Sequence, residues 1–142
     1  MRPRFDVITL GVASIDRSLA FYRDGLGWPT DGVVGTEFHD DLTGADGTIA
    51  FLPLENGLQI ALYHREDLAK DAQVPAEPSG APQFSLIHQA GSRDEVDSVI
   101  AEAVAAGGRL TAAPHMRPFG FYSGYVANPD GHLWEIAWNS KA

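Results

Sequence analysis

The sequence predicts an α+β fold in which a βαβββ module occurs twice in tandem. Three observations lead to this prediction: short runs of β-branched and apolar residues, two stretches with apolar residues at helical spacing, and the same order of elements in each half. The first strands of the halves are offset by 77 residues, from Val7 to Phe84, and the last strands by 74, from Ala61 to Glu135. Because the two offsets differ by only the length of a loop, we interpret the halves as copies of one module.

The first half is expected to begin with a strand over residues 5–12, which reads FDVITLGV. Ser14 and Asp16 offer N-cap oxygens to a helix whose apolar residues recur at helical spacing up to Leu26. Glycines and a proline then end that helix. Three further strands, separated by turn signals, are expected at residues 33–39, 48–54 and 58–64.

The second half repeats this order after a proline-containing linker. Ser92 is expected to cap a helix that ends at Gly107-Gly108. Four strands are expected, at residues 84–90, 109–113, 120–127 and 132–139. We therefore predict one domain over residues 1–142, with a first module at about 5–65, a linker at about 71–82 and a second module at about 83–140.

Composition and charge exclude several classes of protein. The 142 residues contain no cysteine, so disulfides and thiolate metal sites are impossible. The net charge of −9 disfavours contact with phosphate backbones, and we expect no nucleic-acid partner. No apolar run approaches the roughly 20 residues that cross a bilayer, and the N-terminal segment lacks the apolar core of a signal peptide. We therefore expect a cytoplasmic protein without a membrane partner.

Two segments carry a family resemblance. The segment ITLGVASIDRSLAFYRDGLGW, from Ile8 to Trp28, and the segment GYVANPDGHLWEIAW, from Gly124 to Trp138, resemble the opening and closing motifs of the glyoxalase/bleomycin resistance/dioxygenase superfamily, which has the vicinal oxygen chelate fold. This resemblance implies that the two modules form an open-sided, barrel-like cleft. It also implies a homodimer.

The resemblance allows the family's metal site to be tested residue by residue. Metal-dependent members hold one divalent ion with residues from the first and last strand of each half. Those positions fall on Val7, Ala61, Phe84 and Glu135, and only Glu135 has an oxygen donor. One carboxylate cannot replace the water shell of a divalent ion. We therefore expect neither a metal site nor another cofactor.

Glu135 is the candidate catalytic residue, because a carboxylate on an apolar face is suited to act as a general base or as a ligand anchor. The alternative is a purely structural carboxylate that accepts a hydrogen bond from a neighbour such as Tyr63 or Tyr125. Strand alternation places Trp134 and Trp138 on the face opposite Glu135. The candidate ligand-binding residues are those expected to face the cleft: Val7, Thr9, Trp28, Phe51, Ala61, Tyr63, Phe84, Leu86, His88, Phe121, Tyr125 and Glu135.

The favoured function is binding of a small, partly aromatic molecule in an apolar cleft without the family's metal. An enzyme of the same superfamily, a lyase, isomerase or dioxygenase, is the alternative. Such an enzyme would be either metal-dependent or metal-free with Glu135 as general base. The sequence does not identify the ligand, and fold alone does not fix function.

Overall fold

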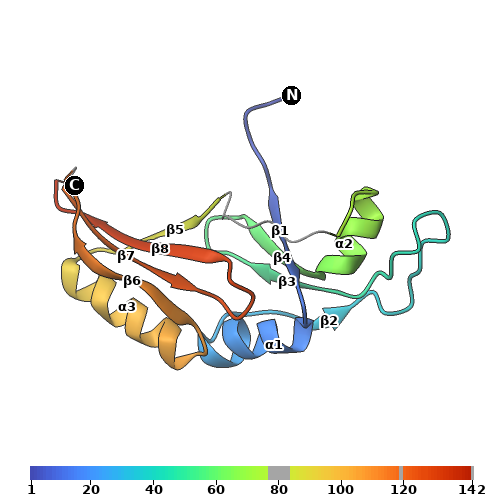
Figure 1. The fold of residues 1–142 in the computed structure, drawn as a ribbon, viewed down its shortest axis with the longest axis horizontal. Coiled ribbons are helices and arrows are strands. Elements are labelled where there is room, and N and C mark those ends of the chain that lie inside the picture. The colour runs from blue at the N-terminus through green and yellow to red at the C-terminus, as the bar shows by residue number, and fades with distance from the viewer. Residues whose placement is uncertain (77–83, 119, 142) are drawn as a thin grey trace. The chain divides into compact units, whose positions relative to one another are not determined.

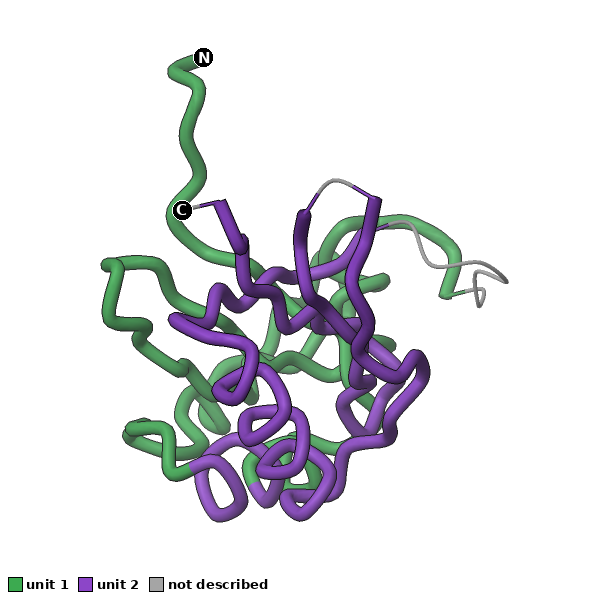
Figure 2. Tube along the Cα trace, turned by 90° about the vertical axis from the view of Figure 1, so that its left-hand side faces the viewer, with its two compact units in different colours: residues 1–19, 27–78 green, residues 20–26, 79–142 purple. Residues whose placement is uncertain are grey.

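The structure is a computed structural model that describes residues 1–76, 84–118 and 120–141. The chain divides into two compact units (Figure 2). Unit 1 contains Met1–Leu19 and Gly27–Pro78, and unit 2 contains Ala20–Leu26 and Ser79–Ala142. The predicted linker lies partly outside the described residues, which resume at Phe84. Each unit is built around its own four-stranded sheet (Figure 1).

The sheet of unit 1 has the strand order β1-β4-β3-β2. Strand β1 (Val7–Val12) runs parallel to β4 (Gln59–His64), which is antiparallel to β3 (Ile49–Pro53). A two-residue strand β2 (Val33–Val34) completes the sheet on β3. The helix α1 (Ile15–Leu19) follows β1, so the predicted βαβββ order of the first half is confirmed.

The two faces of this sheet differ in burial. One face is the core of unit 1, where the strand residues are packed with Ile15 and Leu19 of α1; its buried members are Leu10, Val12, Ala50, Leu52, Ile60 and Leu62. Side chains on the other face alternate with these, as the pleat of a strand requires. Val7 on that face is 43% exposed and Phe51 is 38% exposed. We call it the Val7 face.

The first helix starts as predicted and then changes its form. The Oγ of Ser14 accepts a hydrogen bond from the backbone N–H of Arg17 at 3.1 Å, which confirms the serine cap. After α1 the helix continues as a π-helix, η1 (Ala20–Gly25), and its residues belong to unit 2. Gly25 does not have a positive φ; it is required because a Cβ there would lie 2.4 Å from the Cβ of Ala106.

Two elements of unit 1 differ from the prediction. The strand expected over 33–39 ends at Val34, because Gly35 takes a φ of 76°, and the residues that follow form a loop. The helix α2 (Arg65–Ala72) was not predicted. Its sequence REDLAKDA is too polar to show an apolar stripe, and the residues that it buries are Asp67 and Ala69.

The sheet of unit 2 repeats the arrangement, with the strand order β5-β8-β7-β6. Its strands are β5 (Leu86–Gln89), β6 (Arg109–Met116), β7 (Phe121–Ala127) and β8 (Leu133–Asn139). The helix α3 (Arg93–Ala105) is capped by Ser92, whose Oγ accepts from the backbone N–H of Glu95 at 3.1 Å. The second βαβββ module and its serine cap are thus confirmed, while β6 extends three residues beyond its predicted end.

Helix α3 lies on one face of this second sheet. The hydroxyl of Tyr122 on β7 donates to Asp97 of α3 at 2.7 Å, and Arg93 of α3 lies over the Tyr122 ring. A Cβ at Gly124, on the same face as Tyr122, would lie 2.9 Å from the Cδ1 of Ile100. The opposite face is therefore the one that α3 does not cover.

Candidate functional site

Glu135 lies on the face of the unit 2 sheet that is opposite α3. In the strand register it stands across from Tyr125 of β7 and from Ile87 of β5. We call this surface the Glu135 face; its other members on β7 and β8 are Phe121, Ser123, Ala127, Leu133, Ala137 and Asn139. Trp134 and Trp138 alternate with Glu135 along β8, so their predicted position on the other face is confirmed.

The carboxylate of Glu135 is hydrogen-bonded to a tyrosine. The hydroxyl of Tyr125 donates to Glu135 Oε1 at 3.2 Å. Partial burial raises the pKa of Tyr125, and the charge of Glu135 and this hydrogen bond raise it further. Tyr125 is therefore the neutral donor and Glu135 the acceptor at neutral pH. This is one of the partners that the sequence suggested for a structural carboxylate.

An arginine adds a second charged group to this face. Arg117 donates from Nε to the Oγ of Ser123 at 3.1 Å and from Nη2 to the Ser123 carbonyl at 3.2 Å. Its guanidinium carbon lies 5.8 Å from the centre of the Tyr125 ring. Sequence reasoning missed both residues. The alternation Phe121, Ser123, Tyr125 along one strand was a signal for Ser123, whereas a single arginine in a turn sequence gives none.

Three of the predicted residues near β5 are not part of the Glu135 face. Leu86 stands across from Trp134 and His88 across from Ile136, which places both on the face that α3 covers. Phe84 precedes β5 and is 57% exposed. The predicted grouping of Leu86 and His88 with Glu135 was therefore wrong by one residue of register, which exchanges the two faces of a strand.

The predicted residues of the first half share one face, as expected. Val7, Thr9, Phe51 and Ala61 all lie on the Val7 face, where Thr9 and Phe51 stand across from Ala61 on either side. Tyr63 follows Ala61 by two residues on β4, but its hydroxyl donates to the carbonyl of Asp46 at 2.6 Å. Its polar end is therefore used to hold the loop after β2. Trp28 is half-buried in the segment between η1 and β2 and belongs to no strand.

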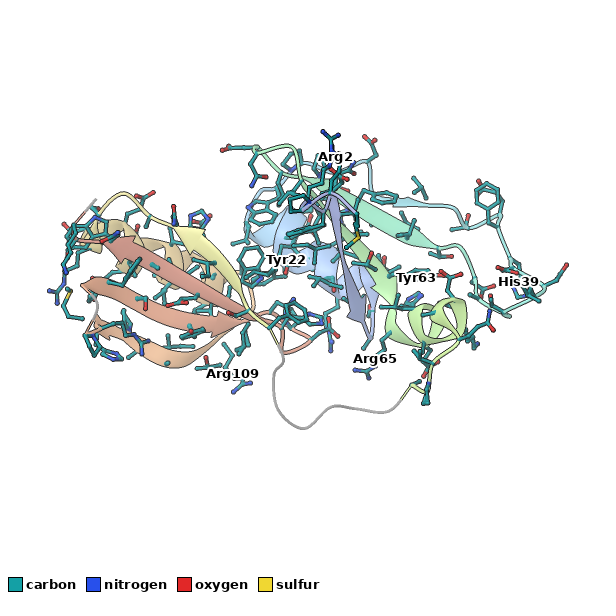
Figure 3. All side chains as sticks on the ribbon, turned by 90° about the horizontal axis from the view of Figure 1, so that it is seen from above. Arg2, Tyr22, His39, Tyr63, Arg65 and Arg109 are labelled. Atoms are coloured by element: carbon teal, nitrogen blue, oxygen red, sulfur yellow. The ribbon has the colours of Figure 1, made fainter. Side chains whose placement is uncertain are left out.

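The loop after β2 carries an acidic pocket in unit 1. A cavity of about 370 Å³ is lined by His39, Asp40, Asp41, Asp46, Asp71 and Tyr63, together with Phe38, Ala45 and Gly47. Figure 3 labels two of these residues, His39 and Tyr63. The Nδ1 of His39 lies 2.8 Å from Asp46 Oδ1, and this hydrogen bond raises the pKa of His39. The backbone N–H of Asp46 donates to Asp67 at 3.0 Å, so the loop is tied to α2 as well.

The residues present do not fit the metal of the family. Val7 and Ala61 offer only carbon, and Glu135 is paired with Tyr125 and faces Ile87. Among the described residues, no three His, Asp or Glu side chains are grouped so that they could hold a metal ion. A single carboxylate is too few donors for a divalent ion in this fold.

Comparisons with known proteins agree with this architecture. A structure of a glyoxalase-related enzyme from Fulvimarina pelagi is 33% identical, with a TM-score of 0.75 over 96% of this chain and 88% of that chain. A lactoylglutathione lyase from Agrobacterium tumefaciens is 22% identical, with a TM-score of 0.62 over 96% of this chain and 93% of that one. A glyoxalase/bleomycin resistance protein/dioxygenase from Nocardioides is 20% identical, with a TM-score of 0.74 over 97% and 84%.

A search of curated proteins gives no match. Within the described part of the chain, no helix is long and apolar enough to cross a membrane. The family model described as Glyoxalase/Bleomycin resistance protein/Dioxygenase superfamily matches residues 4–136, which is nearly the whole chain. The chain therefore belongs to the glyoxalase/bleomycin resistance protein/dioxygenase superfamily.

Proposed function

We propose that this protein binds a small, partly aromatic molecule on the Glu135 face, without the metal of its family. The observation that carries the proposal is the hydrogen-bonded pair of Tyr125 and Glu135, which shares its face with apolar side chains such as Ile87, Phe121 and Ala137. Ligand sites have this composition: an apolar surface with a few polar groups in fixed positions.

The surroundings of the pair support an apolar ligand. Ile87 is 61% exposed across from Glu135, and the half-buried Phe121 lies on the same face of β7. In unit 1, the Val7 face exposes Val7 and Phe51 in a similar way. Exposed apolar side chains that gather on one surface mark binding sites more often than scattered ones do.

The binding test uses 2-naphthol, a neutral aromatic probe, with isothermal titration calorimetry on the tag-free protein. We expect saturable binding that Phe121→Ala weakens about tenfold, because losing one aromatic contact costs about 1–3 kcal/mol. His88→Ala is the matched control, since His88 is exposed on the other face of the sheet. Absence of binding to the native protein, or equal effects of both variants, would contradict the proposal.

The metal-free part of the proposal has its own test. Titration of the same protein with Ni²⁺, Zn²⁺, Mn²⁺ and Fe²⁺ should give no stoichiometric tight binding. Tight binding of one ion per chain that is lost in Glu135→Ala would overturn it and restore a metalloenzyme.

A metal-free enzyme is the second candidate, and the Tyr125–Glu135 hydrogen bond favours it. A carboxylate beside a neutral phenol provides a proton acceptor and a proton donor within hydrogen-bond distance of each other. Once a converted substrate is found, Glu135→Gln separates the two functions. The rate of an acid–base enzyme should fall about 10²-fold or more, whereas a binding protein would lose only some affinity.

Assembly and location are further parts of the proposal. We expect a homodimer, as the family resemblance implies, and light scattering coupled to gel filtration tests it by giving the mass in solution. We also expect a cytoplasmic protein that does not bind nucleic acid. Its net charge of −9 supports the second of these expectations.

A further inference from the structure

We infer that the ligand carries an anionic oxygen, and that Arg117 binds this oxygen at one end of the Glu135 face. The inference rests on the proposed function, because it names the chemical class of the molecule bound at the same site.

The position of the guanidinium group is fixed by the hairpin between β6 and β7. The backbone N–H of Arg117 donates to the carbonyl of Phe121 at 2.6 Å, and Gly120 donates to the carbonyl of Arg117 at 3.0 Å. From this turn the side chain reaches back along β7 to Ser123, to which it makes two hydrogen bonds. Since Ser123 is fully buried, these two bonds hold the guanidinium at a defined place on the sheet.

Arg117 has donors left for a ligand. A guanidinium has five N–H donors, and the bonds to Ser123 use two of them. Within the described residues no carboxylate forms an ion pair with Arg117 and no partner takes the remaining donors. Arg117 is half-buried, in a chain whose net charge is −9. The planar group is suited to bind a carboxylate or phosphate through two parallel hydrogen bonds.

The charges of the face orient the ligand. Tyr125 contacts both charged residues, because its ring lies 5.8 Å from the guanidinium carbon of Arg117 and its hydroxyl donates to Glu135. An anionic oxygen is attracted to Arg117 and repelled by Glu135. A molecule with an aromatic body, an anionic oxygen at one end and a hydrogen-bond donor at the other would therefore match Arg117, Tyr125 and Glu135 in turn.

The test compares two probes of the same shape, 2-naphthoate and 2-naphthamide, by calorimetry at low ionic strength. We expect the native protein to bind 2-naphthoate at least about tenfold more tightly than the neutral amide, because charge-assisted hydrogen bonds are the stronger ones. Arg117→Gln should remove this preference, because it should weaken the binding of 2-naphthoate more than the binding of 2-naphthamide. Ser123→Ala should reduce the preference in part, since Arg117 then loses one of its two anchors.

Arg93→Gln is the matched control, because it removes the same charge from the other side of the sheet, where α3 lies. Equal binding of the two probes to the native protein would overturn the inference and leave the proposed function standing. Equal loss of preference in Arg93→Gln and Arg117→Gln would also overturn it, since the effect would then be one of net charge. If neither naphthalene probe binds, the proposed function fails and the inference fails with it. Circular dichroism of each variant verifies that it is folded.

Discussion

Replacing Tyr22 by phenylalanine tests the polar cluster that fixes the π-helix η1 in unit 2. Tyr22 is completely buried, and its ring packs edge-on against Phe21 with a centroid distance of 4.8 Å. Its hydroxyl oxygen accepts from Asn128 Nδ2 at 3.0 Å and from Trp134 Nε1 at 3.1 Å. Burial raises the pKa of Tyr22, so the hydroxyl is neutral at physiological pH. Phenylalanine keeps the ring but removes the oxygen, and therefore leaves two donors without this acceptor.

The expected loss follows from those two donors. A buried donor left without a partner costs about 1–3 kcal/mol. The amide of Asn128 keeps a second contact, to His132 Nδ1 at 3.0 Å, and the half-buried Trp134 is within reach of water. Both features move the cost of each donor toward the lower end of that range, about 1 kcal/mol. We expect the free energy of unfolding to fall by about 2 kcal/mol, with a decrease in melting temperature of roughly 4–8 °C.

Urea denaturation followed by tryptophan fluorescence measures this change. Tyr63→Phe is the control, because the Tyr63 hydroxyl donates to a single loop carbonyl; its removal should cost about 1 kcal/mol. The double variant Tyr22→Phe/Trp134→Phe should be less destabilised than the sum of the two single variants, since one hydrogen bond is lost in both. A loss below about 0.5 kcal/mol in Tyr22→Phe, with no such coupling, would refute the assignment of the hydroxyl as a required acceptor.

Three further predictions concern other parts of the two units. Glu135→Gln should lower the pKa of Tyr125, because the charge of Glu135 is among the causes that raise it; an absorbance titration that shows no change would contradict the contact. Gly25→Ala should cost about 1–3 kcal/mol in urea denaturation, because its Cβ would overlap Ala106, the residue after α3; an unchanged midpoint would contradict this close approach. The hydrogen bond to Asp46 raises the pKa of His39 above 6.5, so the contact stabilises the loop at pH below 6.5 and is lost as the pH rises through the raised value. Asp46→Asn should return the pKa of His39 toward 6.5 in an NMR titration, and an unchanged value would exclude this cause.

The repeat made the architecture predictable from the sequence. The order of elements in both modules follows from short apolar strands, helix caps and turn residues, and each of these signals is local. Alternation along β8 also assigned the two faces of the strand correctly, because the charged Glu135 differs in polarity from the aromatic Trp134 and Trp138. The serines before α1 and α3 cap their helices as expected.

The sequence-based predictions that failed did so for physical reasons. In β5, Leu86 and Ile87 are both apolar, so alternation gives no means of choosing the face, and an error of one residue exchanges the faces. Helix α2 is held by tertiary contacts of Asp67 and Ala69, which leave no apolar stripe in its sequence. The place of Arg117 depends on a turn and on a buried serine six residues later, a relation that no local pattern expresses.

The carboxylate of Glu135, on β8, has few hydrogen-bonding neighbours among the described residues. Here the described neighbours offer one hydroxyl donor, from Tyr125, and an aliphatic side chain, Ile87. A carboxylate accepts about four hydrogen bonds, so most of its capacity is open to a ligand. Under the proposed function, discrimination at this face should therefore depend on the hydrogen-bond donors that a ligand brings near Glu135, and the proposed role of Arg117 is to set which end of the ligand lies at the hairpin.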